Sequence, residues 1–162
     1  MINTNPNNKT CEIDVIKTII KINKYNLIGD VIEFGTFTGG STRTLSGQFP
    51  DKTIFTIDHF QGLEQTTKNV PNDSDWIERA FALDNPLYVN NSNIPKSIDE
   101  VRQRFIGYDN IKMIISDVHE LTEPSDYGIG KIAVCNLDVD IYEPAVSALE
   151  FLTKCEWSEV FI

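Results

Sequence analysis

The stretch Val31-Ile-Glu-Phe-Gly-Thr-Phe-Thr-Gly-Gly-Ser41 decides the fold. A strand-like apolar run leads through Glu33 to Gly35, and a helical pattern begins after Gly39-Gly40-Ser41. Glycine has no side chain and the first N–H groups of a helix lack partners, so a ligand can approach the backbone here. A second strand-like run ends at Asp58, 23 residues after Gly35. In nucleotide-type α/β folds an acidic side chain binds a ribose hydroxyl at an offset of roughly 20 residues. These features predict a ligand that contains adenosine.

Strand-like and helix-like segments alternate along the rest of the chain. Strands are predicted over residues 31–35, 53–58, 111–116, 132–138 and 159–162. Helices are predicted over residues 12–25, 41–48, 77–82, 97–105 and 144–152, the last with Pro144 at its first position. The strands are almost continuously apolar, which is typical of parallel strands covered by helices on both faces. The predicted fold class is therefore α/β, a Rossmann-like, doubly wound, mostly parallel sheet in three α/β/α layers.

The length of 162 residues predicts a single domain. We expect residues 1–9 to be a disordered lead and residues 10–162 to form the domain, with an insertion or lid over residues 64–96. Because the fifth predicted strand reaches the last residue, we expect the fold to be truncated after that strand. Another chain, such as a second copy in a homo-oligomer, could then cover the open sheet edge.

Composition limits the class of partner. The net charge of −10 argues against nucleic acid, because phosphate neutralisation needs clusters of Lys and Arg. No apolar run approaches the roughly 18 residues of a membrane span, and the N-terminus is polar. The cysteines, Cys11, Cys135 and Cys155, are widely spaced and form no Cys-x-x-Cys pair. We expect a cytoplasmic protein that acts on a small molecule.

Four acidic residues lie at the predicted carboxyl ends of strands, where ligands of such sheets bind. They are Glu33, Asp58, Asp117 and Asp138. Phe37 stands where a dinucleotide fingerprint has its second glycine, and no Gly-Lys-Ser/Thr of a phosphate loop follows. With Arg43 as the only nearby base, the site fits the cationic sulfonium of S-adenosylmethionine better than a pyrophosphate. The alternative is a tight turn without a ligand, which we favour less because of Asp58.

Four segments, in this order, resemble the class I S-adenosylmethionine-dependent methyltransferases, and more narrowly the TylF-like (macrocin O-methyltransferase) family. They are Glu33-Phe-Gly-Thr-Phe-Thr-Gly-Gly-Ser41, Thr56-Ile-Asp-His-Phe-Gln-Gly-Leu-Glu64, Ile114-Ile-Ser-Asp117 and Leu137-Asp-Val-Asp-Ile-Tyr-Glu-Pro-Ala145. Glu64 replaces the proline that is usual in the second segment. The family methylates hydroxyl groups, often on sugars of natural products.

The resemblance implies a set of residues that bind the cofactor S-adenosylmethionine. They are Glu33, Gly35, Thr36, Gly39, Ser41, Asp58, His59, Phe60 and Asp117. Glu33, Gly35 and Gly39 would surround the methionine part, and Ser41 would bind its carboxylate with help from the helix N-terminus. Asp58 would bind the ribose, whereas His59, Phe60 and Asp117 would lie by the adenine. The alternative for Asp117 is a helix N-cap.

The resemblance also implies that Asp138 is the catalytic residue. Related enzymes bind a divalent cation there, so the predicted metal ligands are Asp138 and Asp140. Carboxylates suit Mg²⁺, Ca²⁺ or Mn²⁺, and a bound metal lowers the pKa of a coordinated hydroxyl. The two aspartates share a face if both lie in a strand. In the family a further acidic pair follows the fifth strand.

The leading hypothesis is an S-adenosylmethionine-dependent O-methyltransferase that acts on a hydroxyl of a small molecule such as a sugar. The second is a truncated remnant of such an enzyme that binds the cofactor or serves a structural role without catalysis. The third is a nicotinamide oxidoreductase. Phe37 and the run Asp138-x-Asp140-x-Tyr142-Glu143 count against the third.

Overall fold

The computed structural model describes residues 27–60 and 98–158. Some of the elements expected from the sequence therefore lie outside the described residues. These are the disordered lead over 1–9, the helices over 12–25 and 77–82, the insertion or lid over 64–96, and a strand over 159–162.

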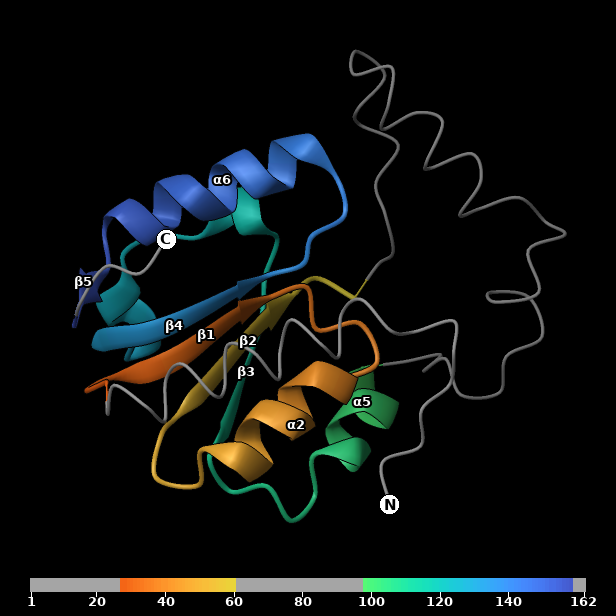
Figure 1. Ribbon diagram of the computed structural model, residues 1–162. Helices are drawn as coiled ribbons and strands as arrows, with labels where there is room; N and C mark the ends of the chain where they lie inside the picture. Colours follow the sequence, from red (N-terminus) through yellow and green to blue (C-terminus); the bar gives the residue numbers. More distant parts are fainter. Residues whose placement is uncertain (1–26, 61–97, 159–162) are drawn as a thin grey trace, which may run out of the picture.

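The described residues form a sheet of five parallel strands (Figure 1). The strands are β1 (Asp30–Phe34), β2 (Ile54–Asp58), β3 (Ile111–Ile115), β4 (Lys131–Leu137) and β5 (Glu156–Trp157). Their order is β3-β2-β1-β4-β5, and every pairing is parallel. The predicted Rossmann-like α/β class is thus confirmed. The order reverses at β1, and ligands of such sheets bind at this switch point.

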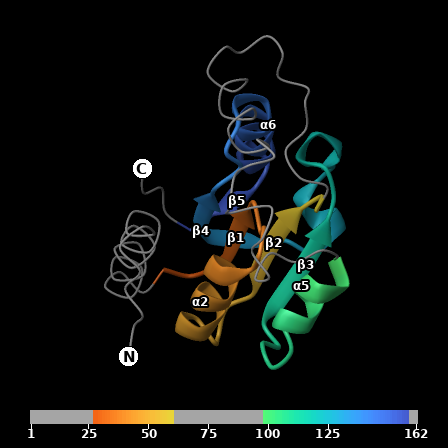
Figure 2. The same cartoon turned by 90° about the vertical axis from the view of Figure 1, so that its right-hand side faces the viewer.

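Helices connect the strands and cover both faces of the sheet, as Figures 1 and 2 show. The helices are α2 (Gly40–Gln48), α5 (Ile98–Arg104) and α6 (Tyr142–Thr153), and two short 3₁₀ helices are η1 (Val118–Glu120) and η2 (Pro124–Tyr127). α2 and α5 lie on one side of the sheet and α6 lies on the other. The three-layer arrangement predicted from the sequence is therefore present.

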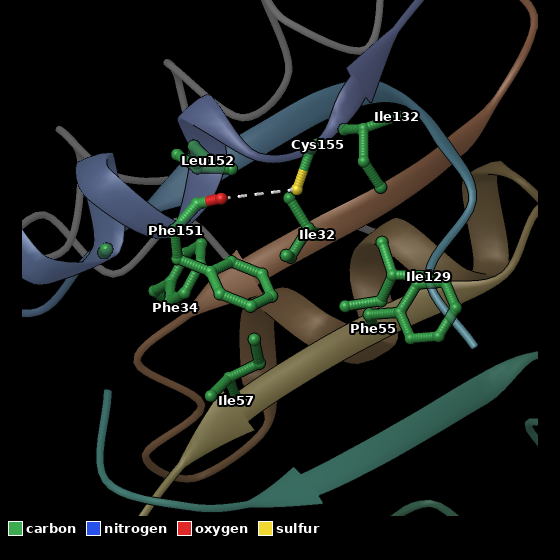
Figure 3. Close-up of a cluster of buried hydrophobic side chains, with 10 residues drawn as sticks. Ile32, Phe34, Phe55, Ile57, Ile129, Ile132, Phe151, Leu152 and Cys155 are labelled. Carbon is green, nitrogen blue, oxygen red and sulfur yellow. Dashed lines mark hydrogen bonds between the residues drawn. The ribbon is translucent and has the colours of Figure 1, made fainter. Parts of the chain in front are cut away.

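The larger core lies between the sheet and α6 (Figure 3). Ile32 and Phe34 of β1 point to this side, and Phe151 of α6 meets Phe34 edge-to-face at 6.1 Å between ring centroids. Such aromatic pairs prefer this geometry because the positive edge of one ring faces the negative face of the other. Neighbouring residues of β1 face opposite sides, so Val31 and Glu33 face α2.

The smaller core lies under α2, where Leu45 and Phe49 pack with Val31 and Ile54. On β4, the consecutive residues Ala133 and Val134 both belong to this core. A register shift between β1 and β4 accounts for this, since Asp30 pairs with Ile132 and Val31 with Val134. A bulge of this kind puts an extra residue on one strand and re-aims those that follow.

The elements β1 to β4, α2 and α5 start and end within one residue of their predicted bounds, whereas α6 begins two residues early. α6 begins at Tyr142, so Pro144 is its third residue and not its first. Proline is tolerated in a first helical turn because the N–H groups there lack helical partners. β5 (Glu156–Trp157) lies just before residues 159–162, and the strand predicted there falls outside the described residues. Within the described residues, no helix is both long and apolar enough to cross a membrane.

Candidate functional site

Three neighbouring strands end together at the carboxyl edge of the sheet. The Gly35 N–H donates to the Ile57 carbonyl at 2.9 Å, and the Asp138 N–H donates to the Phe34 carbonyl at 2.9 Å. The parallel pairing therefore continues one residue past Phe34 and places Gly35 beside Asp58 and Asp138. A Cβ on Gly35 would lie 2.0 Å from the Asp138 carbonyl oxygen, and φ at this glycine is +89°. Only glycine permits this approach.

The loop between β1 and α2 is closed by a second glycine. Gly39 adopts a left-handed conformation with φ +74° at the N-cap of α2, and its N–H donates to the Thr36 carbonyl at 2.8 Å. A Cβ on Gly39 would lie 2.5 Å from the Phe105 ring. Gly39 contributes no side-chain cap, so it leaves the first N–H groups of α2 to other partners. The helix N-terminus carries about half a positive charge, which favours an anionic group.

Asp58 ends β2 and organises two backbone segments. Its Oδ2 accepts the Phe37 N–H at 2.9 Å and its Oδ1 accepts the Phe60 N–H at 2.8 Å. Phe37 and Phe60 have positive φ values of 46° and 58°, which non-glycine residues rarely adopt. A carboxylate offers about four acceptor sites, so Asp58 can accept two more hydrogen bonds. That capacity suits a ribose diol.

Asp117 lies at the same edge, two residues past β3. It is the N-cap of η1, where its Oδ1 accepts the His119 N–H at 2.9 Å and lies 2.7 Å from His119 Nδ1. The structure thus has the N-cap that was the alternative for this residue. Burial raises the pKa of Asp117, but the hydrogen bonds from His119 and the charges of His119 and His59 outweigh it, so the pKa is lowered.

Glu33 lies below the edge and is completely buried, with 0% of its surface exposed. Its Oε2 accepts from the hydroxyls of Thr42 and of Thr56, the latter at 2.9 Å. Its Oε1 accepts from Asn136 Nδ2 at 3.0 Å. Donors from α2, β2 and β4 therefore occupy a carboxylate that the resemblance placed beside the methionine part of the cofactor.

Residues 12–155 match the sequence profile of the family described as Macrocin-O-methyltransferase (TylF). The chain belongs to the macrocin O-methyltransferase family. A structural comparison agrees with this placement. The fold is similar to that of the O-methyltransferase NovP, with a TM-score of 0.63 and 25% sequence identity. That alignment covers 88% of this chain and 59% of the NovP chain. A search of curated proteins finds no match.

The macrocin O-methyltransferase resemblance also singled out Asp138 and Asp140. β4 ends at Leu137, so both aspartates lie in the following loop and are exposed. Asp140 has a positive φ of 61°. Although the residue is exposed, nearby protein atoms displace part of the water around its carboxyl, and this desolvation, followed by the negative charge of Asp138, raises the pKa of Asp140. Two carboxylates suit a hard cation, but across residues 27–60 and 98–158 no group of three potential ligands forms. These residues alone are an incomplete metal site.

The other residues predicted to bind the cofactor differ in burial: some lie at the carboxyl edge of the sheet, and one is buried beneath it. Ser41 is the second residue of α2, and His59 and Phe60 follow β2 directly at the edge. Thr36 is only 2% exposed, and its hydroxyl lies 2.6 Å from that of Thr56. The side chain of Thr36 therefore belongs to the buried layer that also holds Glu33.

Several residues at the site were not predicted from the sequence. Thr56 and Asn136 are polar residues inside otherwise apolar strands, and this interruption is the signal that could have found them. Arg104 of α5 donates through Nη1 to the Thr38 carbonyl at 3.3 Å, and Arg43 donates through Nε to the Gly39 carbonyl at 3.3 Å. Arg43 is therefore not the only base at the loop. Arg104 follows the loop by more than 60 positions, so no local pattern indicated it.

Proposed function

We propose that the chain is an S-adenosylmethionine-dependent O-methyltransferase that acts on a hydroxyl of a small molecule, in particular of a sugar. Family membership over residues 12–155 supports the reaction class. The single observation that carries the cofactor assignment is Asp58, whose carboxylate is fixed by the N–H groups of Phe37 and Phe60 with acceptor capacity remaining. A dinucleotide would need room for a pyrophosphate at position 37, where Phe37 stands.

The cofactor would bind across the carboxyl edge. The first N–H groups of α2 and the Ser41 hydroxyl would hold the methionine carboxylate, because a helix N-terminus attracts anions. Asp58 would accept from the ribose hydroxyls. His59, Phe60 and Asp117 would border the adenine, with Oδ2 of Asp117 as an acceptor. The residues present fit this ligand because they combine backbone donors at one end with carboxylate acceptors at the other.

Methyl transfer to oxygen needs a nucleophile better than a neutral hydroxyl. Asp138 is exposed beside Gly35 at the switch point, so its carboxylate can accept the hydroxyl proton or orient the acceptor. A divalent cation held by Asp138 and Asp140 would lower the pKa of the hydroxyl. S-adenosylmethionine would supply the methyl group: the new bond from oxygen to carbon would replace the bond from carbon to sulfur, leaving a neutral thioether, and the carboxylate of Asp138 would take the hydroxyl proton.

The alternative is a chain that binds the cofactor without transferring the methyl group. One observation favours it. In the described part of the chain, Asp138 and Asp140 have no third metal ligand of the His, Cys, Asp or Glu type beside them.

Calorimetric titration of S-adenosylmethionine into the 162-residue chain tests the proposal, with and without Mg²⁺. We expect binding, and a loss of affinity of about tenfold or more in Asp58→Ala, since hydrogen bonds to a charged partner are lost. Asp51→Asn is the matched control, because Asp51 is an exposed turn residue away from the carboxyl edge. A folded chain that binds no S-adenosylmethionine would overturn the proposal. Transfer of labelled methyl to a panel of sugars then separates the enzyme from the non-catalytic alternative.

A further inference from the structure

The buried carboxylate of Glu33 joins three elements. It accepts from Thr42 of α2, from Thr56 of β2 at 2.9 Å and from Asn136 of β4 at 3.0 Å. Buried carboxylates are costly unless donors saturate them, so such a network is maintained only when all its members are in place. The donors come from both strands that flank β1 and from the helix that follows it.

The donor and the acceptor of each hydroxyl hydrogen bond in this network can be assigned. Thr56 donates its proton to Glu33, so it can only accept in its 2.6 Å contact with the Thr36 hydroxyl. Thr36 must therefore be the donor. Thr36 belongs to the loop after β1, and the chain of donors thus runs from the loop through β2 to the carboxylate. The loop is connected to Glu33 through Thr36 at its start and through Thr42 just beyond its end.

The network lies directly beneath the candidate cofactor site. Glu33 pairs in register with Thr56 on one side and with Asn136 on the other, which forms a row across three strands. The row that contains Asp58 and Asp138 lies two residues further along the same strands. Alternate residues of a strand point to the same face. The two rows are therefore neighbours on the same face of the sheet, with the buried carboxylate in the row below the edge.

We propose that Glu33 is a positioning residue that fixes the loop over residues 35–41 and the start of α2 without touching the cofactor. This role differs from the contact with the methionine part that the resemblance implied. Complete burial and occupation of both carboxylate oxygens by the chain's own donors leave Glu33 no surface for a ligand. The effect on cofactor affinity rests on the proposed function, whereas the effect on the loop does not.

The proposal is tested by swapping the carboxylate of Glu33 in β1 with the amide of Asn136 in β4. Asn136→Asp would set two carboxylates 3.0 Å apart, and they could not both be ionised without strong repulsion. In Glu33→Gln/Asn136→Asp, the new amide at position 33 would donate to the new carboxylate at position 136. Its oxygen would still accept from Thr42 and Thr56. The double variant thus keeps every hydrogen bond and moves only the charge.

The readouts are hydrogen exchange of the amides over residues 35–42 in the ligand-free chain and calorimetric affinity for S-adenosylmethionine. For Asn136→Asp we expect hydrogen exchange about tenfold faster and cofactor affinity about tenfold weaker than in the wild type at about pH 8. Both differences from the wild type should disappear as the pH falls to about 5, because a proton shared by the two carboxylates then removes the repulsion. The double variant should restore wild-type values without that pH dependence. A double variant no better than Asn136→Asp would overturn the proposal.

A second pair of variants covers the case in which Asn136→Asp does not fold. Thr42→Val removes the hydroxyl that donates to Glu33, whereas Thr42→Ser keeps it. Thr44→Val is the matched control, because the exposed Thr44 hydroxyl donates to the Gly40 carbonyl within α2, at 3.1 Å, and not to Glu33. We expect faster loop exchange in Thr42→Val alone. Unchanged exchange in Thr42→Val would refute the positioning role. If the wild-type chain binds no cofactor, the proposed function fails but the exchange result still decides the role of Glu33.

Discussion

The carboxylate of Asp58 accepts the backbone N–H of Phe37 at 2.9 Å, and this bond joins the end of β2 to the loop that follows β1. Phe37 has a positive φ of 46°, which non-glycine residues rarely adopt, and it is 54% exposed. Asp58 therefore shapes the loop as well as offering acceptors to a ligand. These two roles can be tested separately, because the effect of Asp58 on the loop changes the stability of the fold even when no cofactor is present.

We expect Asp58→Asn to lower the free energy of unfolding by about 1–3 kcal/mol in the absence of ligand. An amide has one acceptor, so its NH₂ group would face the N–H of either Phe37 or Phe60. Urea denaturation measures the effect, and Asp51→Asn should stay within about 0.5 kcal/mol of the wild type. Equal stability of the two variants would show that Asp58 does not hold the loop.

Gly35 should tolerate no side chain. In Gly35→Ala the new Cβ would meet the Asp138 carbonyl oxygen at 2.0 Å, with φ at +89°. The strands must separate or the loop must refold, so we expect a loss of about 3 kcal/mol or more and loss of cofactor binding.

Gly47→Ala is the matched control for this prediction. Gly47 lies in α2, and no atom stands within 4 Å of the position that a Cβ would take there. Alanine favours a helix over glycine, so the variant should be more stable by about 0.5–1 kcal/mol. Thermal and urea denaturation of both variants gives the comparison. A Gly35→Ala chain as stable as the wild type would contradict the close approach of β1 and β4.

The first four strands and their parallel direction were predictable from local sequence. Continuous apolar runs mark strands that are covered on both faces, and Asp58 closes β2 as predicted. The position of Asp58 relative to Gly35 indicated an edge where both would meet, and the register confirms that they do.

The buried network and the short fifth strand were not predictable in the same way. Asn136 bonds Glu33 across 103 positions, so their contact depends on strand order, which no local pattern specifies. Glu33 is buried because alternate residues of β1 point to opposite faces of the sheet, and α2 covers the face to which Glu33 points. β5 has only two paired residues, too few for a period-two pattern to show.

The described cysteines should resist alkylation in the native chain. Burial, with smaller contributions from Cys155 and Glu33, raises the pKa of Cys135 to about 12, and burial raises the pKa of Cys155 to about 11. Less than about 1% of either thiol is then ionised at neutral pH, and the thiolate is the reactive form. Mass spectrometry after iodoacetamide treatment should show modification of both only in urea. Rapid labelling of either in buffer would contradict the burial.

The pairing of Asp117 with His119 predicts a specific pH dependence of stability. Hydrogen bonds and charge from His119 outweigh burial and lower the folded-state pKa of Asp117 below its ordinary value of 3.8. A carboxyl with a lowered folded pKa stabilises the fold above its unfolded pKa, and this contribution is lost as the pH falls through the folded value. Asp117→Asn should therefore be less stable than the wild type at about pH 7, and the difference should vanish at about pH 2. Urea denaturation across this range measures it, with Asp51→Asn as the control for a carboxyl in an exposed turn. A difference between the wild type and Asp117→Asn that stays constant with pH would mean that the carboxyl acts through shape alone and not through its charge.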